Sequence, residues 1–384
     1  MTSQDSRAKV RGKQEKAQDP HRSLHSATGA RAGEHPGRSR NPLVKVAGLA
    51  WLEFEKPDLD RAGRFGTDFG FTVSDRTRES LVLRARQAGA ACLVVRRGPR
   101  PRFTGVAFQA AARDDLDRLA RGAGATVMAH RGGEAVQLRD PSGFPVRVVY
   151  GVPELPALPV RAPLPLNFGP EPVRVNATQR PSRQAAEIQR LGHVVLGTTR
   201  FGAALDWYLD TLGLIVSDFL YLDGQRDRGP AMAFIRCDLG SVPADHHTLA
   251  MILQPRTEYV HSACELTDLD EVAASGEYLR ERGYRHAWGL GRHIQGSQIF
   301  DYWRDPDRLM FEHYADGDVF DCSAEPGWAP LSVSGLAQWG PRATAGFTGA
   351  RDPGVVVAAI KALRDKGNEI DMRALRGLVK AMSS

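Results

Sequence analysis

The residues best suited to chemistry in this chain are its histidines, and they are concentrated in one stretch. Seven of the 11 histidines lie between His193 and His313. Burying a histidine is costly unless it has partners, so their clustering on predicted strands requires an explanation. Two of them, His193 and His261, could bind a metal together with Glu312. Two neutral imidazoles and one carboxylate leave one face of an Fe(II) ion open for substrate and oxygen.

The spacing of these three residues does not by itself identify a metal site. His193 and His261 are 68 residues apart, and His261 and Glu312 are 51 apart, which is too far for a local metal-binding motif. Taken singly, each histidine is more simply explained as a hydrogen-bonded core residue, and the glutamate as a surface residue. A site built from them therefore depends on elements that bring distant parts of the chain together.

An internal repeat supplies such elements. Residues 60–75 read DRAGRFGTDFGFTVSD and residues 203–218 read AALDWYLDTLGLIVSD. Both stretches predict a short amphipathic helix, a glycine at its C-terminal end (Gly70 and Gly213), and a strand that ends in Val-Ser-Asp. Each half continues with a strand, an acidic helix start, and a closing strand after an Asp-Pro turn. The predicted unit is a strand, a helix and three strands, present twice per domain and four times in all.

Comparison of the two copies favours the metal site. The first copy has the strand 49–52 (LAWL) in place of His193, the strand from Gly105 (GVAF) in place of His261, and Arg147 in place of Glu312. All three potential ligands are therefore absent together from the first copy. This pattern predicts that the second domain binds a metal and that the first domain supports it.

The chain resembles the type I extradiol ring-cleavage dioxygenases of the vicinal oxygen chelate superfamily. This family includes catechol 2,3-dioxygenases, homoprotocatechuate 2,3-dioxygenases and dihydroxybiphenyl dioxygenases. The resemblance covers about residues 44–340. It is strongest from His193 to Tyr314, and three stretches look like the family's signature: 291–293 (GRH), 300–306 (FDYWRDP) and 311–314 (FEHY). It implies an α+β fold of two domains, each with two βαβββ modules.

The resemblance also implies roles for individual residues. A His, His, Glu triad binds Fe(II), or occasionally Mn(II), in this family, and the matching residues are His193, His261 and Glu312. His293 and Tyr302 match residues that contact the substrate and oxygen. The acid/base histidine lies on the strand before the second ligand and matches His247. His246 is the alternative, because a one-residue shift would exchange the faces of the two side chains. Trp288 and Trp303 suggest an apolar aromatic substrate, although either could belong to the core.

The charge, the apolar content and the proline content along the chain predict the domain boundaries. The net charge is +6, and residues 1–42 carry +5 of it, with no Phe, Tyr, Trp or Ile. Such a segment cannot bury enough apolar surface to offset its ordering entropy. A proline-rich stretch follows the first domain and resists both strand and helix. The predicted parts are a disordered basic tail (1–42), a metal-free domain (43–151), a linker (152–186), a catalytic metal-binding domain (187–322) and a C-terminal extension with amphipathic helices (323–384).

Partners and location follow from what the sequence lacks. It has no apolar signal segment, no 18-residue apolar run and no CxxC pair among its four cysteines, so we expect a cytoplasmic enzyme without membrane contact. Outside the basic tail there is no nucleic-acid-binding signature, so we expect no nucleic-acid partner. The C-terminal helices and the family resemblance together favour a homo-oligomer. The expected partners are otherwise a small catecholic substrate and O2.

Two alternative functions compete with the dioxygenase. A glyoxalase-like lyase or isomerase on the same fold would need another carboxylate on the strand before the second ligand, and residues 246–254 contain neither Asp nor Glu. A non-catalytic small-molecule-binding protein would not need the triad together with His247, His293 and Tyr302. The sequence therefore favours an Fe(II)-dependent extradiol dioxygenase of aromatic catabolism. It does not specify the ring substituents or distinguish iron from manganese.

Overall fold

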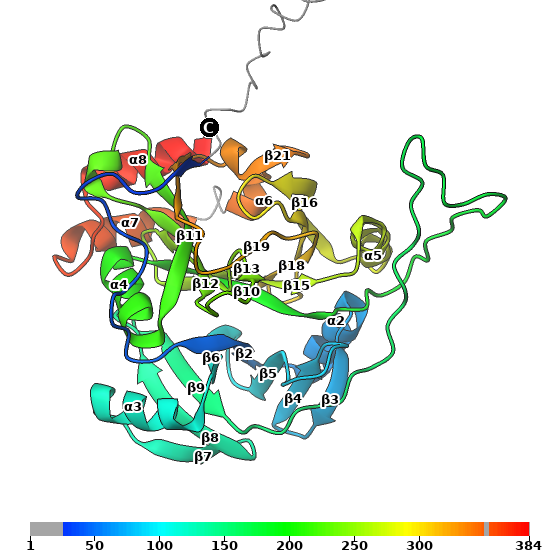
Figure 1. Ribbon diagram of the computed structural model, residues 1–384, viewed down its shortest axis with the longest axis horizontal. Helices are drawn as coiled ribbons and strands as arrows, with labels where there is room; N and C mark the ends of the chain where they lie inside the picture. Colours follow the sequence, from blue (N-terminus) through cyan, green and yellow to red (C-terminus); the bar gives the residue numbers. More distant parts are fainter. Residues whose placement is uncertain (1–25, 349–352, 384) are drawn as a thin grey trace, which may run out of the picture.

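A computed structural model describes residues 26–348 and 353–383, which form two large mixed sheets with helices packed against them (Figure 1). The first sheet has eight strands in the order β3-β4-β5-β2-β6-β9-β8-β7. Its strands and helices are β2 (Val46–Lys56), α2 (Leu59–Phe69), β3 (Thr72–Arg76), β4 (Ser80–Arg84), β5 (Leu93–Arg97), β6 (Arg102–Ala110), α3 (Arg113–Ala123), β7 (Val127–His130), β8 (Gly133–Arg139) and β9 (Pro145–Tyr150).

The second sheet has eleven strands in the order β1-β20-β11-β12-β14-β10-β15-β18-β17-β16-β21. A separate two-stranded ribbon joins β13 to β19. The elements of this half are β1 (Ala27–Thr28), β10 (Arg190–Thr198), α4 (Phe201–Leu212), β11 (Leu214–Leu222), η2 (Arg226–Arg228), β12 (Met232–Cys237), β13 (Ala244–Asp245), β14 (Leu249–Leu253), β15 (Glu258–Glu265), α5 (Leu269–Glu281), β16 (Arg285–His293), β17 (Ile299–Arg304), β18 (Met310–Ala315), β19 (Val319–Phe320), β20 (Gly327–Leu331), η3 (Ser334–Leu336), β21 (Ala337–Trp339), α6 (Ala345–Thr348), α7 (Pro353–Arg364) and α8 (Met372–Ser383).

The repeat predicted from the sequence is present in the strand order. In the first sheet, β2 and β6 form a central antiparallel pair, flanked by β5 and β9 in parallel. In the second sheet, β10 and β15 form the same central pair, flanked by β14 and β18 in parallel. Each half thus contains two βαβββ modules joined at the centre of its sheet, which confirms the predicted α+β vicinal oxygen chelate fold.

Glycine ends the first helix of each half, as predicted. Gly70 after α2 and Gly213 after α4 both have left-handed backbone, with φ of 119° and 64°. A Cβ at Gly213 would lie 2.4 Å from the carbonyl oxygen of Val44, and one at Gly70 would lie 2.6 Å from that of Ala186. Glycine is therefore required for the turn and also for the close approach of a neighbouring segment.

The two halves contact each other next to the candidate ligand Glu312. His313, the following residue on β18, is fully buried and stacks on Phe69 at the end of α2, with ring centroids 3.8 Å apart. Its Nε2 donates a hydrogen bond to the carbonyl oxygen of Phe69 at 2.7 Å. The first half thus helps to fix the position of β18, the strand that presents Glu312 on its opposite face.

The prediction of a disordered tail over residues 1–42 is wrong for its described part. Residues 26–42 lie against the second sheet, where β1 pairs with β20. The Glu34 carboxylate accepts two hydrogen bonds from Arg226, at 2.7 and 3.0 Å. Backbone pairing and ion pairs hold this segment, and neither needs the apolar side chains on which the sequence-based prediction depended. Residues 1–25 lie outside the described residues.

The C-terminal segment contains more than the predicted helices. Helices α7 and α8 are present, and β20 and β21 add strands to both ends of the second sheet.

Between Gly151 and Gln189 the described chain has no helix or ladder strand, and in Figure 1 the linker loops out from the body, as its prolines predict. No helix in the described residues is long and apolar enough to cross a membrane.

The Glu34–Arg226 pair predicts a specific dependence of stability on pH. The Arg226 hydrogen bonds lower the pKa of Glu34 from 4.5 to about 2. The pair therefore stabilises the fold above pH 4.5, and this contribution is lost as the pH falls through about 2. Because Glu34 is near the surface, we expect Glu34→Gln to lower the free energy of unfolding by only about 1 kcal/mol at pH 7.

Urea unfolding from pH 7 to pH 2 measures this effect. The difference between wild type and Glu34→Gln should shrink towards zero at the acid end, where Glu34 becomes protonated. Glu171→Gln in the linker serves as the control and should show no such difference. A Glu34→Gln difference that is independent of pH would contradict the ion-pair explanation.

Candidate metal centre

Three strands bring the candidate ligands together at the centre of the second sheet. His193 lies on β10, His261 on β15 and Glu312 on β18. Their potential ligand atoms all lie within 4.8 Å of one another. Nε2 of His193 is 3.3 Å, and Nε2 of His261 is 3.2 Å, from Oε2 of Glu312. The structure thus assembles three residues that are far apart in sequence, and all three are buried.

The environment of Glu312 fits a metal cation. Its carboxylate is fully buried, and neither oxygen has a hydrogen bond of regular geometry within the described chain. Burial alone would raise the pKa of Glu312, but the imidazoles of His193, His261 and His293 outweigh it and hold this pKa well below its usual range. A buried carboxylate without a hydrogen-bond donor is strongly disfavoured unless a cation compensates its charge. Two imidazoles and one carboxylate are a donor set suited to a divalent transition metal.

The equivalent positions of the first sheet are filled differently. Strand register aligns His193, Ala263 and Glu312 in one half with Trp51, Ala107 and Arg147 in the other. The Trp51 indole donates to Oε1 of Glu53 at 3.0 Å, and Arg147 forms an ion pair with the same carboxylate. In the described residues, the only cluster suited to a metal is the one in the second half. A tryptophan and an internal ion pair therefore occupy the corresponding space in the first copy.

His293 and Tyr302 form a directed pair beside the triad. Nδ1 of His293 is 2.8 Å from the carbonyl oxygen of Leu336, which can only accept, so this nitrogen carries a proton. The Tyr302 hydroxyl, 2.9 Å from Nε2 of His293, therefore donates to it when the imidazole is neutral. Burial, followed by the negative charge of Glu312, raises the pKa of Tyr302 well above its usual value. Tyr302 thus remains a protonated hydrogen-bond donor.

His247 lies against the triad, whereas His246 points away from it. The rings of His247 and His193 have centroids 3.9 Å apart. His246 instead places its Nε2 2.7 Å from Oδ2 of Asp218. Desolvation by burial, followed by repulsion from His193, lowers the pKa of His247 well below its usual value. Of the two adjacent histidines, the geometry favours His247 for contact with a ligand at the centre.

The other aromatic and histidine residues divide between the two faces of the sheet. Trp288 stacks on Tyr302, with centroids 5.7 Å apart, so it belongs to the surroundings of the centre. Trp303 instead hydrogen-bonds to Asp301, which also binds His286. The Leu336 carbonyl that orients His293 has no recognisable sequence signal. Asp218 belongs to the Val-Ser-Asp motif that recurs in both copies, but the motif does not indicate its contact with His246.

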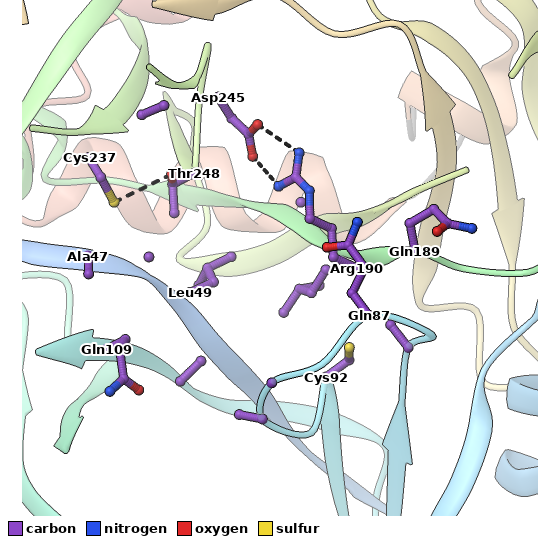
Figure 2. A pocket seen from close by; sticks show the side chains of 18 of the residues that line it. Ala47, Leu49, Gln87, Cys92, Gln109, Gln189, Arg190, Cys237, Asp245 and Thr248 are labelled. Carbon is purple, nitrogen blue, oxygen red and sulfur yellow. Dashed lines mark hydrogen bonds and ion pairs between the residues drawn. The ribbon is translucent and has the colours of Figure 1, made fainter. Parts of the chain in front are cut away.

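A cavity of about 470 Å³ lies elsewhere, between the two halves (Figure 2). Leu49 and Cys92 line it from the first half, and Cys237, Thr248 and the Arg190–Asp245 ion pair line it from the second. None of the six candidate site residues contributes to its wall. This cavity is therefore separate from the metal centre.

Comparison with known proteins identifies the family. Residues 190–313, which include all the candidate site residues, match the model of the Glyoxalase/Bleomycin resistance protein/Dioxygenase superfamily. Metapyrocatechase 2 of Cupriavidus necator is 32% identical over 324 residues, which cover 83% of this chain and 95% of that protein. The chain belongs to the extradiol dioxygenase family. It is accordingly an enzyme of the oxidoreductase class.

Other extradiol dioxygenases differ in the metal that they are named for. An iron-dependent extradiol dioxygenase of Rhodococcus jostii is 27% identical, covering 40% of this chain and 50% of that protein. A manganese-dependent 2,3-dihydroxybiphenyl 1,2-dioxygenase of Geobacillus genomosp. 3 is 24% identical, covering 78% of this chain and 95% of that protein. Family membership thus establishes a metal-dependent class without choosing between the two ions.

Solved structures share the fold of this extradiol dioxygenase. Homoprotocatechuate 2,3-dioxygenase from Brevibacterium fuscum superposes with a TM-score of 0.65 at 19% identity, covering 82% of this chain and 95% of that one. The Mn(II)-bound glyoxalase from Novosphingobium aromaticivorans gives a TM-score of 0.65 at 21% identity, covering 79% and 94%. Because a dioxygenase and a glyoxalase superpose equally well, the fold does not distinguish these activities.

Proposed function

We propose that this enzyme cleaves the aromatic ring of a catechol next to the vicinal diol, using O2 and Fe(II), with Mn(II) as the alternative ion. The observation that carries the proposal is the buried Glu312 carboxylate, which has two imidazoles within 3.3 Å and no regular hydrogen bond. The proton-handling residues His247, His293 and Tyr302 surround it. A centre with three protein ligands leaves coordination positions for both the diol and oxygen.

His193, His261 and Glu312 would hold the metal. When bound, the ion would lower the pKa of the catechol hydroxyls and bring the organic substrate and oxygen into one coordination sphere. The two neutral imidazoles and the single carboxylate leave a divalent ion with a net positive charge, which favours a catecholate ligand. The three ligands stand on adjacent paired strands inside the second sheet, which would hold these side chains in position.

His247 would act as the acid and base. Its low pKa keeps the imidazole neutral, so it can accept a proton from a catechol hydroxyl at the centre. In the later step it would return that proton to the departing oxygen atom. Its contact with His193 places it on the first ligand's side of the centre.

Tyr302 and His293 would act together on negative charge that develops on oxygen. Tyr302 is protonated and buried, and His293 is held in place by Leu336. The Tyr302 hydroxyl, which donates to Nε2 of His293 in this structure, would turn its proton to the developing oxyanion and lower its energy. The stacked Trp288 adds an apolar wall suited to an aromatic ring.

We expect Tyr302→Phe to lower kcat by about 100-fold, the size of effect seen when one oxyanion donor is removed. The ring still fills its place against Trp288, so the metal content and thermal stability should change little. Steady-state kinetics with a catechol and metal analysis of the same preparation test this. An unchanged kcat would show that the Tyr302 hydroxyl has no part in the reaction.

Product analysis separates the dioxygenase from the glyoxalase-like alternative. A catechol should give a yellow ring-opened semialdehyde or keto acid in the presence of oxygen, and nothing under anaerobic conditions. A glutathione hemithioacetal should not turn over, since residues 246–254 supply no further carboxylate. Turnover of the hemithioacetal without oxygen-dependent turnover of any catechol would overturn the proposal.

A homo-oligomer and a cytoplasmic location remain predictions from the sequence.

A further inference from the structure

A buried chain of three polar residues leads from the metal centre to Asp218 on β11. Nδ1 of His247 lies 3.1 Å from Nδ1 of His246, and Nε2 of His246 lies 2.7 Å from Oδ2 of Asp218. His246 and His247 are 1% and 3% exposed, and Asp218 is 8% exposed. The two imidazole rings are nearly perpendicular, at 88°. Neither His246 nor Asp218 touches the three metal-ligand candidates.

The Asp218 carboxylate, at the end of this chain, determines which nitrogen of each imidazole carries a proton. An ionised carboxylate can only accept, so Nε2 of His246 carries a proton and donates it to Asp218. In a neutral His246, Nδ1 is then the acceptor. It can accept only if Nδ1 of His247 carries the proton of that ring. The remaining nitrogen of His247, Nε2, is then left with a free lone pair.

We propose that Asp218 and His246 are positioning residues that hold His247 in the Nδ1-protonated tautomer, with Nε2 as the free base on the metal side. This proposal rests on the proposed function, because it gives His247 the lone pair that accepts a substrate proton. A histidine in the opposite tautomer would present an N–H to the substrate and could not act as the base.

The surroundings hold His246 in this one orientation. Its backbone N–H donates to the carbonyl oxygen of Asp318 at 2.8 Å, and its carbonyl oxygen accepts from the Ser217 hydroxyl at 2.6 Å. The fully buried Arg236 donates to the same hydroxyl at 2.8 Å. Gly296 covers the ring, and a Cβ at this position would lie 3.0 Å from Nδ1 of His246. The ring is therefore enclosed and fixed by several partners.

The first half of the chain lacks the metal-ligand triad, so it shows which of Asp218, His246 and His247 occur only together with the triad. Strand register aligns Asp218 with Asp75, so the aspartate is common to both halves. Counted back without a gap from the equivalent Leu249 and Leu93, His246 and His247 correspond to Ala90 and Ala91. The half without the triad thus lacks both histidines, and there Asp75 lies exposed on β3.

Two substitutions at His246 separate tautomer control from simple packing. His246→Asn places an amide oxygen near the former Nδ1, where it can still accept a hydrogen bond from His247. This variant loses the hydrogen bond to Asp218. His246→Gln keeps a donor near the former Nε2 for Asp218, but leaves no acceptor for His247. If His246 only fills space and pairs with Asp218, the Gln variant should have the higher kcat of the two. If His246 controls the tautomer of His247, the Asn variant should have the higher kcat.

The test is ¹⁵N NMR of histidine-labelled, Zn(II)-loaded full-length chain, with the His247 signals identified by their loss in His247→Gln. We expect a proton on Nδ1 of His247 in wild type and in His246→Asn, and loss of this preference in His246→Gln. With a catechol, kcat should fall at least about 10-fold more in the Gln than in the Asn variant, as for other orienting partners of site histidines. Thermal unfolding checks that both variants fold.

The wild-type spectrum alone can overturn the proposal, even if a variant does not fold. A proton on Nε2 of His247 with an imidazolium at His246 would contradict it, as would a Gln variant that keeps the wild-type tautomer. Because the spectrum does not depend on turnover, the two proposals fail separately. An Nδ1-protonated His247 in a chain that cleaves no catechol would refute only the proposed function.

Discussion

Glu312→Gln is expected to abolish metal retention and to lower kcat/KM for a catechol by at least about 1,000-fold, since the bound metal contributes several kcal/mol to such reactions. The amide is neutral and presents an N–H₂ group to the imidazoles of His193 and His261, so it cannot balance the charge of a divalent ion. Metal analysis after dialysis against Fe(II), together with kinetics, measures both losses.

Unfolding is not the cause expected for this loss. Glutamine has nearly the size and shape of glutamate, so it fills the same buried space without leaving a cavity. Metal-free Glu312→Gln should therefore still unfold cooperatively in urea, although it loses the stabilisation that the neighbouring imidazoles give to the carboxylate. Glu277→Gln, a half-exposed glutamate on α5, is the matched control and should keep both metal and activity. Full metal content in Glu312→Gln would contradict the assignment of this residue as a ligand.

His247→Ala is expected to lower kcat by about 100- to 10,000-fold, the range typical of a lost general acid–base group. Metal content should stay near that of wild type, because the triad is intact. This combination distinguishes His247 from the ligands, which should lose metal and activity together. Single-turnover experiments with a pre-bound catechol locate the defect in the chemical step.

His286→Gln provides the comparison for His247→Ala. His286 hydrogen-bonds to Asp301 and makes no contact with the triad, so this variant should retain nearly full activity. An equal loss in both variants would indicate that general perturbation of the sheet, not proton transfer at His247, limits the reaction.

Internal repetition allowed much of the fold to be predicted from the sequence. The Val-Ser-Asp strands and the glycines at 70 and 213 mark equivalent places in two copies, so the strand order of one half predicts that of the other. The same comparison selects His193, His261 and Glu312, which the structure brings within 4.8 Å of one another. Residues that differ between otherwise equivalent positions carry more information than any single motif.

Other features depend on backbone groups and on contacts that leave no pattern in the sequence. The Leu336 carbonyl orients His293, although any residue type could supply a carbonyl at that point. The pairing of β1 with β20 is likewise a backbone interaction within a segment of low hydrophobicity. The contact of His246 with Asp218 could not be inferred, because strand alternation alone does not say which adjacent histidine faces the centre.

Oxygen consumption after anaerobic reconstitution tests the central claim most directly. The chain is loaded with Fe(II) without oxygen, its bound iron is measured, and oxygen uptake is then followed with a panel of catechols. We predict uptake of one O2 per catechol consumed, with a yellow ring-opened product, for at least one member of the panel. Stoichiometric bound iron with no oxygen uptake for any catechol would contradict the assignment as an extradiol dioxygenase.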